Sequence, residues 1–334
     1  MPITTRERFR GTMNRTKIDR LPVIEWAPWW DKTLERWHTE GLPLDVATHR
    51  QAYAWFGLDD WRLTWVRALT ADAPPPASHG APLISSRADY DAFQKHLWPE
   101  CQANLDDLKA WRDEHADGSC VVWIMLEGFF WFPRRLLGIE PHLYAFYDQP
   151  ELMKAINDRL ADYHLECLER IGRVLRPDFI NFAEDLAYNN GPMISKGLWD
   201  EFIAPYYARV LPKIRELGSL VMMDSDGLMD PAIPWLLDVG LDGVEPLERQ
   251  AGVDVAALRC KYPTLKMLGA YDKMVMPRGR AAMKAEFERL LPVMASGGYL
   301  PGCDHQTPPG VSLENYYTYL ELFREYAAKA VADW

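Results

Sequence analysis

Short apolar runs alternate with longer helical stretches along almost the whole chain, and this alternation limits the possible fold more than any other feature. Each run ends in polar residues, after which apolar positions recur with helical spacing. In chain order the runs are Pro22–Trp26, Trp61–Val66 (a weaker one), Cys120–Leu126, Phe179–Ala183, Leu220–Met223, Gly243–Glu245, Leu265–Ala270 and Gly298–Gly302. Strands that alternate with helices form parallel sheets, and eight of them in 334 residues predict an α/β protein of the (β/α)8, or TIM, barrel type. No GxGxxG motif follows the first run, which disfavours a dinucleotide-binding fold.

Charge and cysteine content exclude several classes of protein. The 37 Lys and Arg residues and 48 Asp and Glu residues give a formal net charge of −11, so a basic surface for nucleic acid is not expected. No stretch approaches the length of apolar sequence that a membrane span needs. The five cysteines form no CxxC pair, and the N-terminus lacks the apolar core of a secretory signal. We therefore expect a cytoplasmic protein with reduced thiols.

The domain organisation follows from where the runs lie. We expect one barrel domain over residues 1–334, with an N-terminal helix in residues 1–20 that starts at a capping box formed by Thr4 and Glu7. Residues 29–119 are long for one barrel connection and hold several tryptophans and the proline-rich segment 72–77. We interpret them as an elaborated N-terminal insertion that covers the mouth of the barrel.

Acidic residues follow nearly every predicted strand. In barrels of this type the catalytic groups lie where the strands end. The side chains found there, in chain order, are Glu25 and Trp26, Glu127, Glu184, Asp185 and Tyr188, Asp224 and Asp226, Glu245, Asp272, and Cys303 and His305. Each acid alone is explained equally well as the cap of a following helix. Together they predict a shared cavity that needs a cation, a protonated partner or a cationic ligand to offset their repulsion.

Two pairs at a spacing of two residues stand out as candidates for chemistry. Asp224 and Asp226 face the same way in an extended strand, and so do Cys303 and His305. We assign catalytic roles to Asp224, Asp226, His305 and Glu184. Cys303, His305, Asp224 and Asp226 are also candidate ligands for Zn²⁺, although a buried cysteine is commonly just a small apolar residue. A site without metal is the alternative.

Aromatic residues after the first run complete the predicted site. Trp26, Trp29 and Trp30 are candidates for an aromatic wall around a planar substrate, with core packing as the alternative, and Phe129, Phe130 and Trp131 are candidates to extend it. Glu127, Asp185, Tyr188, Glu245 and Asp272 are further candidate substrate-binding residues. Arg134 and Arg135 suit either a carboxylate or phosphate or the start of a surface helix. No serine-hydrolase elbow, phosphate loop or HExxH motif is present.

The motifs resemble those of the uroporphyrinogen decarboxylase (URO-D) superfamily. The resemblance covers nearly the whole chain and rests on four segments: 6–9 with 17–23, 184–188 with 194–195, 224–227, and 297–299 leading to 304–309. It implies a (β/α)8 barrel, in agreement with the alternation of runs, and a dimer as in many members of the superfamily.

Two branches of the superfamily differ from this chain at informative positions. True uroporphyrinogen decarboxylases carry an arginine-rich segment after the first strand, where this chain has the acidic and aromatic residues 25–30. An acidic cavity repels a substrate with eight carboxylates. The cobalamin-dependent methyltransferases carry a His-x-Cys zinc motif where this chain has Asp224 and Asp226, whereas Cys303 matches their last zinc ligand.

The resemblance to the second branch implies a corrinoid-dependent methyltransferase. It would move a methyl group from a small methoxylated or methylated substrate to a corrinoid carried by a partner protein. The alternatives are a decarboxylase acting on a porphyrin-related or other carboxylated substrate, and a non-catalytic protein that binds a tetrapyrrole or corrinoid.

Overall fold

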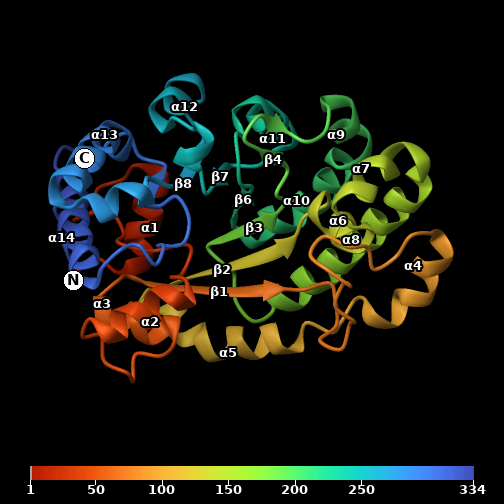
Figure 1. Cartoon of the computed structure of the whole chain (residues 1–334), viewed down its shortest axis with the longest axis horizontal. Coiled ribbons are helices and arrows are strands. Elements are labelled where there is room, and N and C mark those ends of the chain that lie inside the picture. Colours follow the sequence, from red (N-terminus) through yellow and green to blue (C-terminus); the bar gives the residue numbers. More distant parts are fainter. Residues whose placement is uncertain (1) are drawn as a thin grey trace.

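The computed structural model describes residues 2–334 as a curled, parallel α/β sheet surrounded by helices (Figure 1). Seven strands in the order β1-β2-β3-β6-β7-β8-β9 form the sheet, and β4 (Ala187–Tyr188) and β5 (Gly191–Pro192) form a small separate hairpin. The seven are β1 (Asp60–Val66), β2 (Cys120–Glu127), β3 (Phe179–Ala183), β6 (Leu220–Asp224), β7 (Gly243–Glu245), β8 (Lys266–Tyr271) and β9 (Tyr299–Cys303). Seven of the eight predicted runs are therefore strands, each within one or two residues of its predicted bounds.

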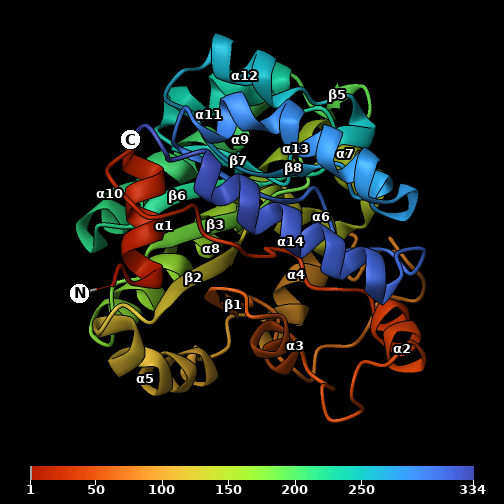
Figure 2. The ribbon, with the colours of Figure 1, turned by 90° about the vertical axis from the view of Figure 1, so that its left-hand side faces the viewer.

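Fourteen α-helices are present in the described chain, and most lie on the outer side of the sheet (Figures 1 and 2). They are α1 (Thr5–Asn14), α2 (Asp31–Thr39), α3 (His49–Phe56), α4 (Arg87–Phe93), α5 (Gln102–Ala116), α6 (Trp131–Leu137), α7 (Ile139–Asp148), α8 (Pro150–Gly172), α9 (Lys196–Phe202), α10 (Ala204–Leu217), α11 (Ile233–Val239), α12 (Val255–Lys261), α13 (Arg280–Met294) and α14 (Leu313–Lys329). Short 3-10 helices occupy Gln94–His96, Asp230–Ala232, Arg249–Ala251 and Lys273–Arg278. No helix of residues 2–334 is both long enough and apolar enough to cross a membrane.

Both faces of the central strands are buried, which explains their nearly continuous apolar runs. All eight residues of β2 are buried. Its alternate side chains divide between two cores: Trp123 and Met125 lie in the inner core, and Ile124 and Leu126 lie in the outer core beneath the helices.

Helix α1 closes the end of the sheet where the strands begin. Its capping box forms as predicted, and Phe9 and Met13 pack into the inner core against Trp61 and Phe179. The N-terminal helix is therefore at the opposite end from the predicted mouth.

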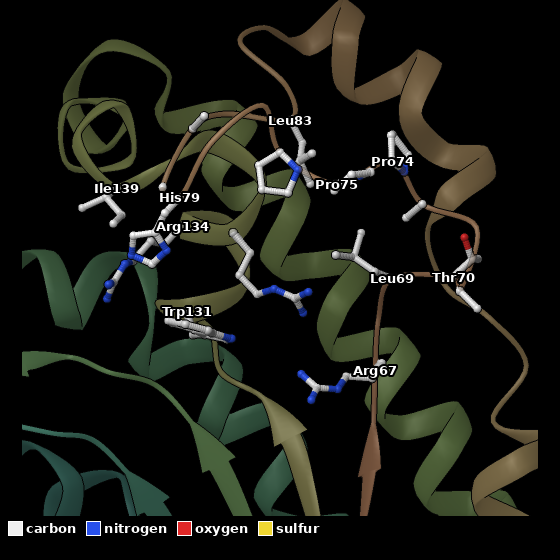
Figure 3. Close-up of a pocket in the computed structure, with 16 residues that line it drawn as sticks. Arg67, Leu69, Thr70, Pro74, Pro75, His79, Leu83, Trp131, Arg134 and Ile139 are labelled. Carbon is white, nitrogen blue, oxygen red and sulfur yellow. The ribbon is translucent and has the colours of Figure 1, made fainter. Parts of the chain in front are cut away.

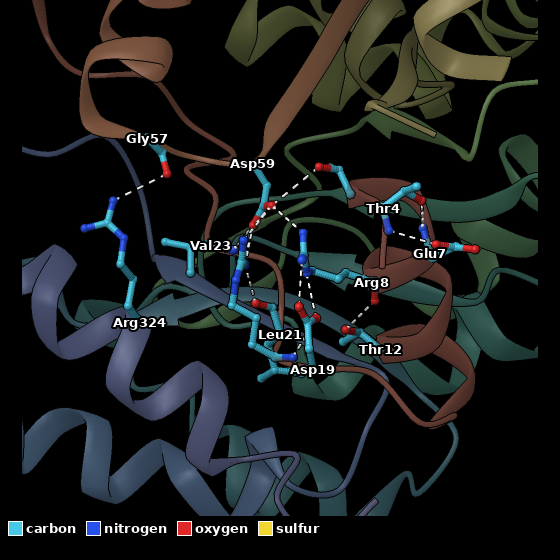
Figure 4. Close-up of polar contacts among 12 residues, drawn as sticks. Thr4, Glu7, Arg8, Thr12, Asp19, Leu21, Val23, Gly57, Asp59 and Arg324 are labelled. Atoms are coloured by element: carbon cyan, nitrogen blue, oxygen red, sulfur yellow. Dashed lines mark hydrogen bonds and ion pairs between the residues drawn. The ribbon is translucent and has the colours of Figure 1, made fainter. Parts of the chain in front are cut away.

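The predicted strand Pro22–Trp26 is not a strand, and this part of the prediction is wrong. The segment still occupies the gap between β9 and β1. The N–H of Asp59 donates to the Val23 carbonyl (3.0 Å), and the Val23 N–H donates to the Asp59 carboxylate (2.7 Å; Figure 4). Asp59 also accepts two hydrogen bonds from Arg20. A side chain thus takes the place of a backbone partner, so no regular ladder forms.

The same contact recurs at two true strand pairs. Asp178 donates its N–H to the Val122 carbonyl and accepts the Val122 N–H. Asp242 does the same with Val221. In each case an aspartate just before one strand forms two hydrogen bonds with a valine of the neighbouring strand. Asp59 forms the same two hydrogen bonds with Val23, although Val23 is not in a strand. The observed architecture is a curled seven-stranded sheet whose two edges are joined by an extended segment.

Candidate functional site

A cavity of about 350 Å³ lies at the ends of the strands, inside the curled sheet. Its polar wall contains Asp185, Asp224, Asp226 and His305, and Trp26 lies beside them. These five residues, predicted from four separate strand ends, are therefore brought together. The remaining lining residues are mainly apolar: Ala27, Pro28, Leu63, Trp65, Trp123, Met125, Trp131 and Ala183, with Gln306.

Sheet register places the deepest acids. Asp224 ends β6 and pairs with Ala183 of β3 on one side and Glu245 of β7 on the other. Glu245 is buried, does not line the cavity, and accepts a hydrogen bond from the Asn181 amide. The predicted substrate-binding residue Glu245 therefore lies beside Asp224, behind the cavity wall.

The acids of this wall hold their protons more tightly than ordinary carboxyls. Burial, followed by the charges of Glu248 and Asp185, raises the pKa of Asp226 to about 7. Burial and the neighbouring Glu245 raise the pKa of Asp224 well above its usual range. Protonated carboxyls at neutral pH relieve the repulsion between the acids and provide hydrogen-bond donors.

The backbone turns sharply where β3 ends, and this turn separates two adjacent acids. Asp185 has a φ of 45°, an uncommon conformation for a residue other than glycine, and its side chain lines the cavity. Glu184 points to the outside, as strand alternation dictates when Ala183 faces in. Its carboxylate accepts the N–H groups of Phe129 (2.9 Å), Phe130 (2.7 Å) and Trp131 (3.1 Å).

Glu184 is therefore a structural residue in this fold, and its predicted catalytic placement is wrong. It also accepts the Tyr207 hydroxyl and is fully buried. Burial raises its pKa to about 7. By holding three successive N–H groups at the start of α6, it fixes the backbone of Trp131, which does line the cavity.

His305 presents a neutral imidazole to the cavity. Its Nδ1 accepts the N–H of Gln306 (2.8 Å), so a neutral ring carries its proton on Nε2. Burial and the nearby Lys273 lower the pKa of His305. The ring lies edge-on to Trp26, 6.0 Å between centroids, and the Trp26 indole N–H donates to the Cys303 carbonyl (2.7 Å).

Only part of the predicted aromatic wall is in place. Trp26 is in place, but Trp29 is buried in a separate cluster with Trp37 and Tyr316, and Trp30 is about half exposed at the start of α2. These two predictions are wrong because the chain leaves the sheet edge at Pro28, so the later residues pack against α3 and α14. The tryptophans that line the cavity with Trp26 are Trp65, Trp123 and Trp131.

Three other predicted substrate-binding residues lie outside the cavity. Glu127 is buried and forms an ion pair with Arg135 (2.6 Å). Tyr188 is about half exposed on the β4–β5 hairpin. Asp272 caps the 3-10 helix after β8 by accepting the Met274 N–H. For Asp272 the capping alternative is therefore correct.

Cys303 and His305 do not point together, because the strand ends at Cys303 and the chain bends at Asp304. The Cys303 thiol lies 3.7 Å from the Met276 sulfur and 3.9 Å from a Glu25 carboxylate oxygen, and it is absent from the cavity lining.

The predicted zinc ligands do not fit a zinc ion as they stand. Zinc ligands converge on one point, at about 2.0–2.3 Å from the metal. Within residues 2–334, the only three His, Cys, Asp or Glu side chains with ligand atoms within 4.8 Å of one another are Asp60, Glu114 and Cys120. That group faces Arg62, which forms ion pairs with both acids.

Several residues of the site were not predicted from the sequence. Trp65 and Trp123 follow the alternation of their strands, and each faces inward with Leu63 or Met125 two residues away. The charged neighbours are Glu248, which precedes the 3-10 helix Arg249–Ala251, and Lys273, which begins the 3-10 helix Lys273–Arg278; both follow predicted strands but were not chosen as site residues. Lys273 forms an ion pair with the buried Asp304 (2.9 Å).

Gly227 allows the loop that carries Asp226 to approach the β4–β5 hairpin. Its φ is +84°, and a Cβ there would lie 2.6 Å from the Tyr188 Cα. Gly252 has a similar φ of +89° with no atom within 4 Å of a built Cβ. Both Gly→Ala variants incur the backbone cost of about 1–2 kcal/mol. We expect urea unfolding to show that Gly227→Ala lowers the free energy of unfolding by about 1–3 kcal/mol more than Gly252→Ala does, because the Tyr188 backbone must move. Equal losses in the two variants would show that the close approach is unimportant.

The geometry defines a class of protein: an α/β barrel-like fold with an acid-rich, tryptophan-walled cavity at the strand ends. A family model described as uroporphyrinogen decarboxylase (URO-D) matches residues 133–326, more than half of the chain. The chain therefore belongs to the URO-D family, and the resemblance stated from the sequence motifs is confirmed.

A solved structure of a methyltransferase agrees with this fold. A methyltransferase from Methanosarcina mazei superimposes with a TM-score of 0.66 and 14% sequence identity, covering 97% of this chain and 99% of the other. The exo-beta-1,4-mannosidase Op5Man5 from Opitutaceae bacterium strain TAV5 gives a TM-score of 0.45 and 12% identity, covering 93% of this chain and 61% of the other. At 14% identity the likeness to the methyltransferase concerns the fold alone. No curated protein sequence matches the chain significantly.

Proposed function

We propose that this protein is a methyltransferase that removes a methyl group from a small, uncharged or cationic methoxylated or methylated molecule and passes it to a corrinoid carried by a partner protein. The observation that carries the proposal is that Asp224 and Asp226 line one cavity of about 350 Å³ together with Trp26, Trp65 and Trp123. Four tryptophans suit a flat, apolar or cationic guest. The M. mazei methyltransferase of the same fold supports the same class of reaction.

The chemistry that the cavity must supply is protonation of a poor leaving group. When the bond between the substrate oxygen and its methyl carbon breaks, the methyl group passes to the acceptor nucleophile and the oxygen keeps the electron pair. Asp226, with a pKa raised to about 7, holds a proton that it can give to that oxygen. His305, with its proton on Nε2, and protonated Asp224 are further hydrogen-bond donors in the same wall. The corrinoid, when present, supplies the nucleophile.

A decarboxylase is the second candidate function, because the matched family model bears that description. The acidic wall argues against a polyanionic porphyrinogen, since carboxylates of substrate and protein repel one another in a poorly screened cavity. A smaller monocarboxylate remains compatible with a wall of protonated acids.

The test offers reduced free cobalamin and a panel of methoxyarenes carrying an isotope-labelled methyl group to the purified full chain. We expect label to appear on the cobalamin together with the free phenol. Parallel reactions with aromatic carboxylic acids and with uroporphyrinogen measure release of CO₂. Release of CO₂ without methyl transfer would replace our proposal with the decarboxylase. Tight tetrapyrrole binding without turnover would replace it with a carrier.

A further inference from the structure

A second cavity, of about 480 Å³, lies next to the first and has the opposite charge. Arg67, immediately after β1, and Arg134 and Arg135, on α6, line it together with Trp131. The loop that contains Pro74 and Pro75 forms the facing wall (Figure 3). Trp131 lines both cavities, so the two cavities share this residue.

Arg67 is the unusual member of this group. Its guanidinium lies 3.2 Å from the centroid of the Trp65 ring, and within residues 2–334 it forms no hydrogen bond or ion pair. Figure 3 shows it extending from the end of β1 toward Trp131. A guanidinium that rests on an aromatic face keeps its edge donors free for a planar anion.

The other two arginines are only partly satisfied by the protein. Arg134 donates once, to the Asp185 carbonyl (3.3 Å), and its charge centre lies 5.2 Å from the Trp131 ring. Arg135 pairs with Glu127, whose second carboxylate oxygen has no partner. Three guanidinium groups thus face one carboxylate, in a chain whose formal net charge is −11. The excess positive charge is local and lies in a concave site with apolar walls.

We propose that this second cavity binds an organic anion, a carboxylate or a phosphate ester with a flat apolar body. Arg67 and Arg134 hold the anionic group, and Trp131 with the proline-rich loop packs against the apolar body. Arg135, neutralised by Glu127, positions α6 and adds long-range attraction. The proposal goes beyond methyl transfer and does not depend on it. It concerns binding of an anion in the second cavity, which Asp224 and Asp226 do not line.

The position of Trp131 gives this site a consequence for the first cavity. Its backbone N–H is held by Glu184, and its ring forms part of both walls. An anion in the second cavity therefore lies against a residue that also lines the cavity of the catalytic acids.

Titration calorimetry on the full chain tests the proposal with phenyl phosphate, benzoate and the uncharged benzyl alcohol as probes. We expect saturable binding of at least one anion, and binding of benzyl alcohol that is weaker by about tenfold or more. Arg67→Gln and Arg134→Gln each weaken anion binding by about tenfold or more, because each removes a charge-assisted hydrogen-bond donor. Arg280→Gln is the matched control, since Arg280 pairs with Glu321 on α13 and α14, away from both cavities.

Several outcomes would overturn the proposal. They are the absence of saturable binding of both anions, equal binding of benzyl alcohol and phenyl phosphate, and unchanged affinity in the Arg67→Gln/Arg134→Gln double variant with the far-ultraviolet circular dichroism of the parent. Loss of anion binding in Asp226→Asn but not in Arg67→Gln would place the anion in the first cavity and also overturn it. The demethylation assay is separate, so its failure leaves this result unaffected.

Discussion

Replacing Asp226 with asparagine is expected to lower kcat for demethylation of a methyl ether by about 10²- to 10⁴-fold, the usual contribution of a positioned general acid. Asparagine keeps the size and the hydrogen-bonding shape of the neutral acid but has no proton to transfer. Asp226 lines the cavity, and the nearby Lys273 is paired with Asp304, so the substitution leaves no cation unpaired. The measurement is single-turnover transfer of labelled methyl groups under saturating substrate.

The pH dependence of the parent enzyme checks the same assignment. A general acid acts only while protonated, so the rate is highest below its pKa and falls as the pH rises through about 7. In the Asp226→Asn variant we expect the rate to show no such fall near pH 7. A substrate whose leaving group needs no proton, such as a methylated nitrophenol, retains most of its rate in the variant.

Asp230→Asn is the control for the Asp226 substitution. Asp230 lies four residues away, is partly exposed and pairs with Lys261, outside the cavity. We expect its kcat to stay within about twofold of the parent value. An Asp226→Asn enzyme that demethylates both kinds of ether at parental rates would remove Asp226 from the mechanism.

Strand prediction succeeded where burial on two faces leaves a continuous apolar run. β2 and β3 are buried throughout, so their sequences carry the signal directly. Pro22–Trp26 carries the same apolar signal but is held by the Asp59 carboxylate and by Glu25, whose carboxylate accepts the Cys303 N–H (3.3 Å). These partners are more than 30 residues away along the chain, and no local pattern shows that side chains replace the ladder there.

The site shows a sharper limit on what the sequence can predict. That acids gather at the strand ends follows from topology alone, and Asp185, Asp224, Asp226 and His305 confirm it. Which acid of an adjacent pair faces the cavity depends on alternation up to the last strand residue. That rule, applied to β3, would have placed Glu184 outside. Strand alternation fails after Cys303, because the chain bends at Asp304 and His305 no longer points to the same side as Cys303.

Asp178→Ala is expected to lower the free energy of unfolding by about 3–5 kcal/mol, the cost of removing one partner from a buried ion pair. The Asp178 side chain has no exposed surface and accepts hydrogen bonds from Arg6 (2.7 Å), His115 (3.0 Å) and the Val122 N–H (3.2 Å). Its loss leaves two buried or half-buried cationic or polar side chains and a backbone N–H without a partner. It also frees α1 from the end of the sheet that this helix closes. Asp113→Ala, at a position with 93% side-chain exposure, is the control and should change stability by less than about 0.5 kcal/mol.

The stability that Asp178 contributes is expected to depend on pH. Burial alone would raise the pKa of Asp178, but the hydrogen bonds from His115 and Arg6 outweigh it and hold the pKa below its usual value. A carboxyl whose pKa is lower in the folded state stabilises the fold above its unfolded pKa, which is about 3.9, and loses that contribution as the pH falls through the folded pKa. Urea unfolding of parent and Asp178→Ala should therefore differ most near neutral pH and converge below about pH 4. A difference that grows on acidification would mean that Asp178 is not the anion that ties α1 to the sheet.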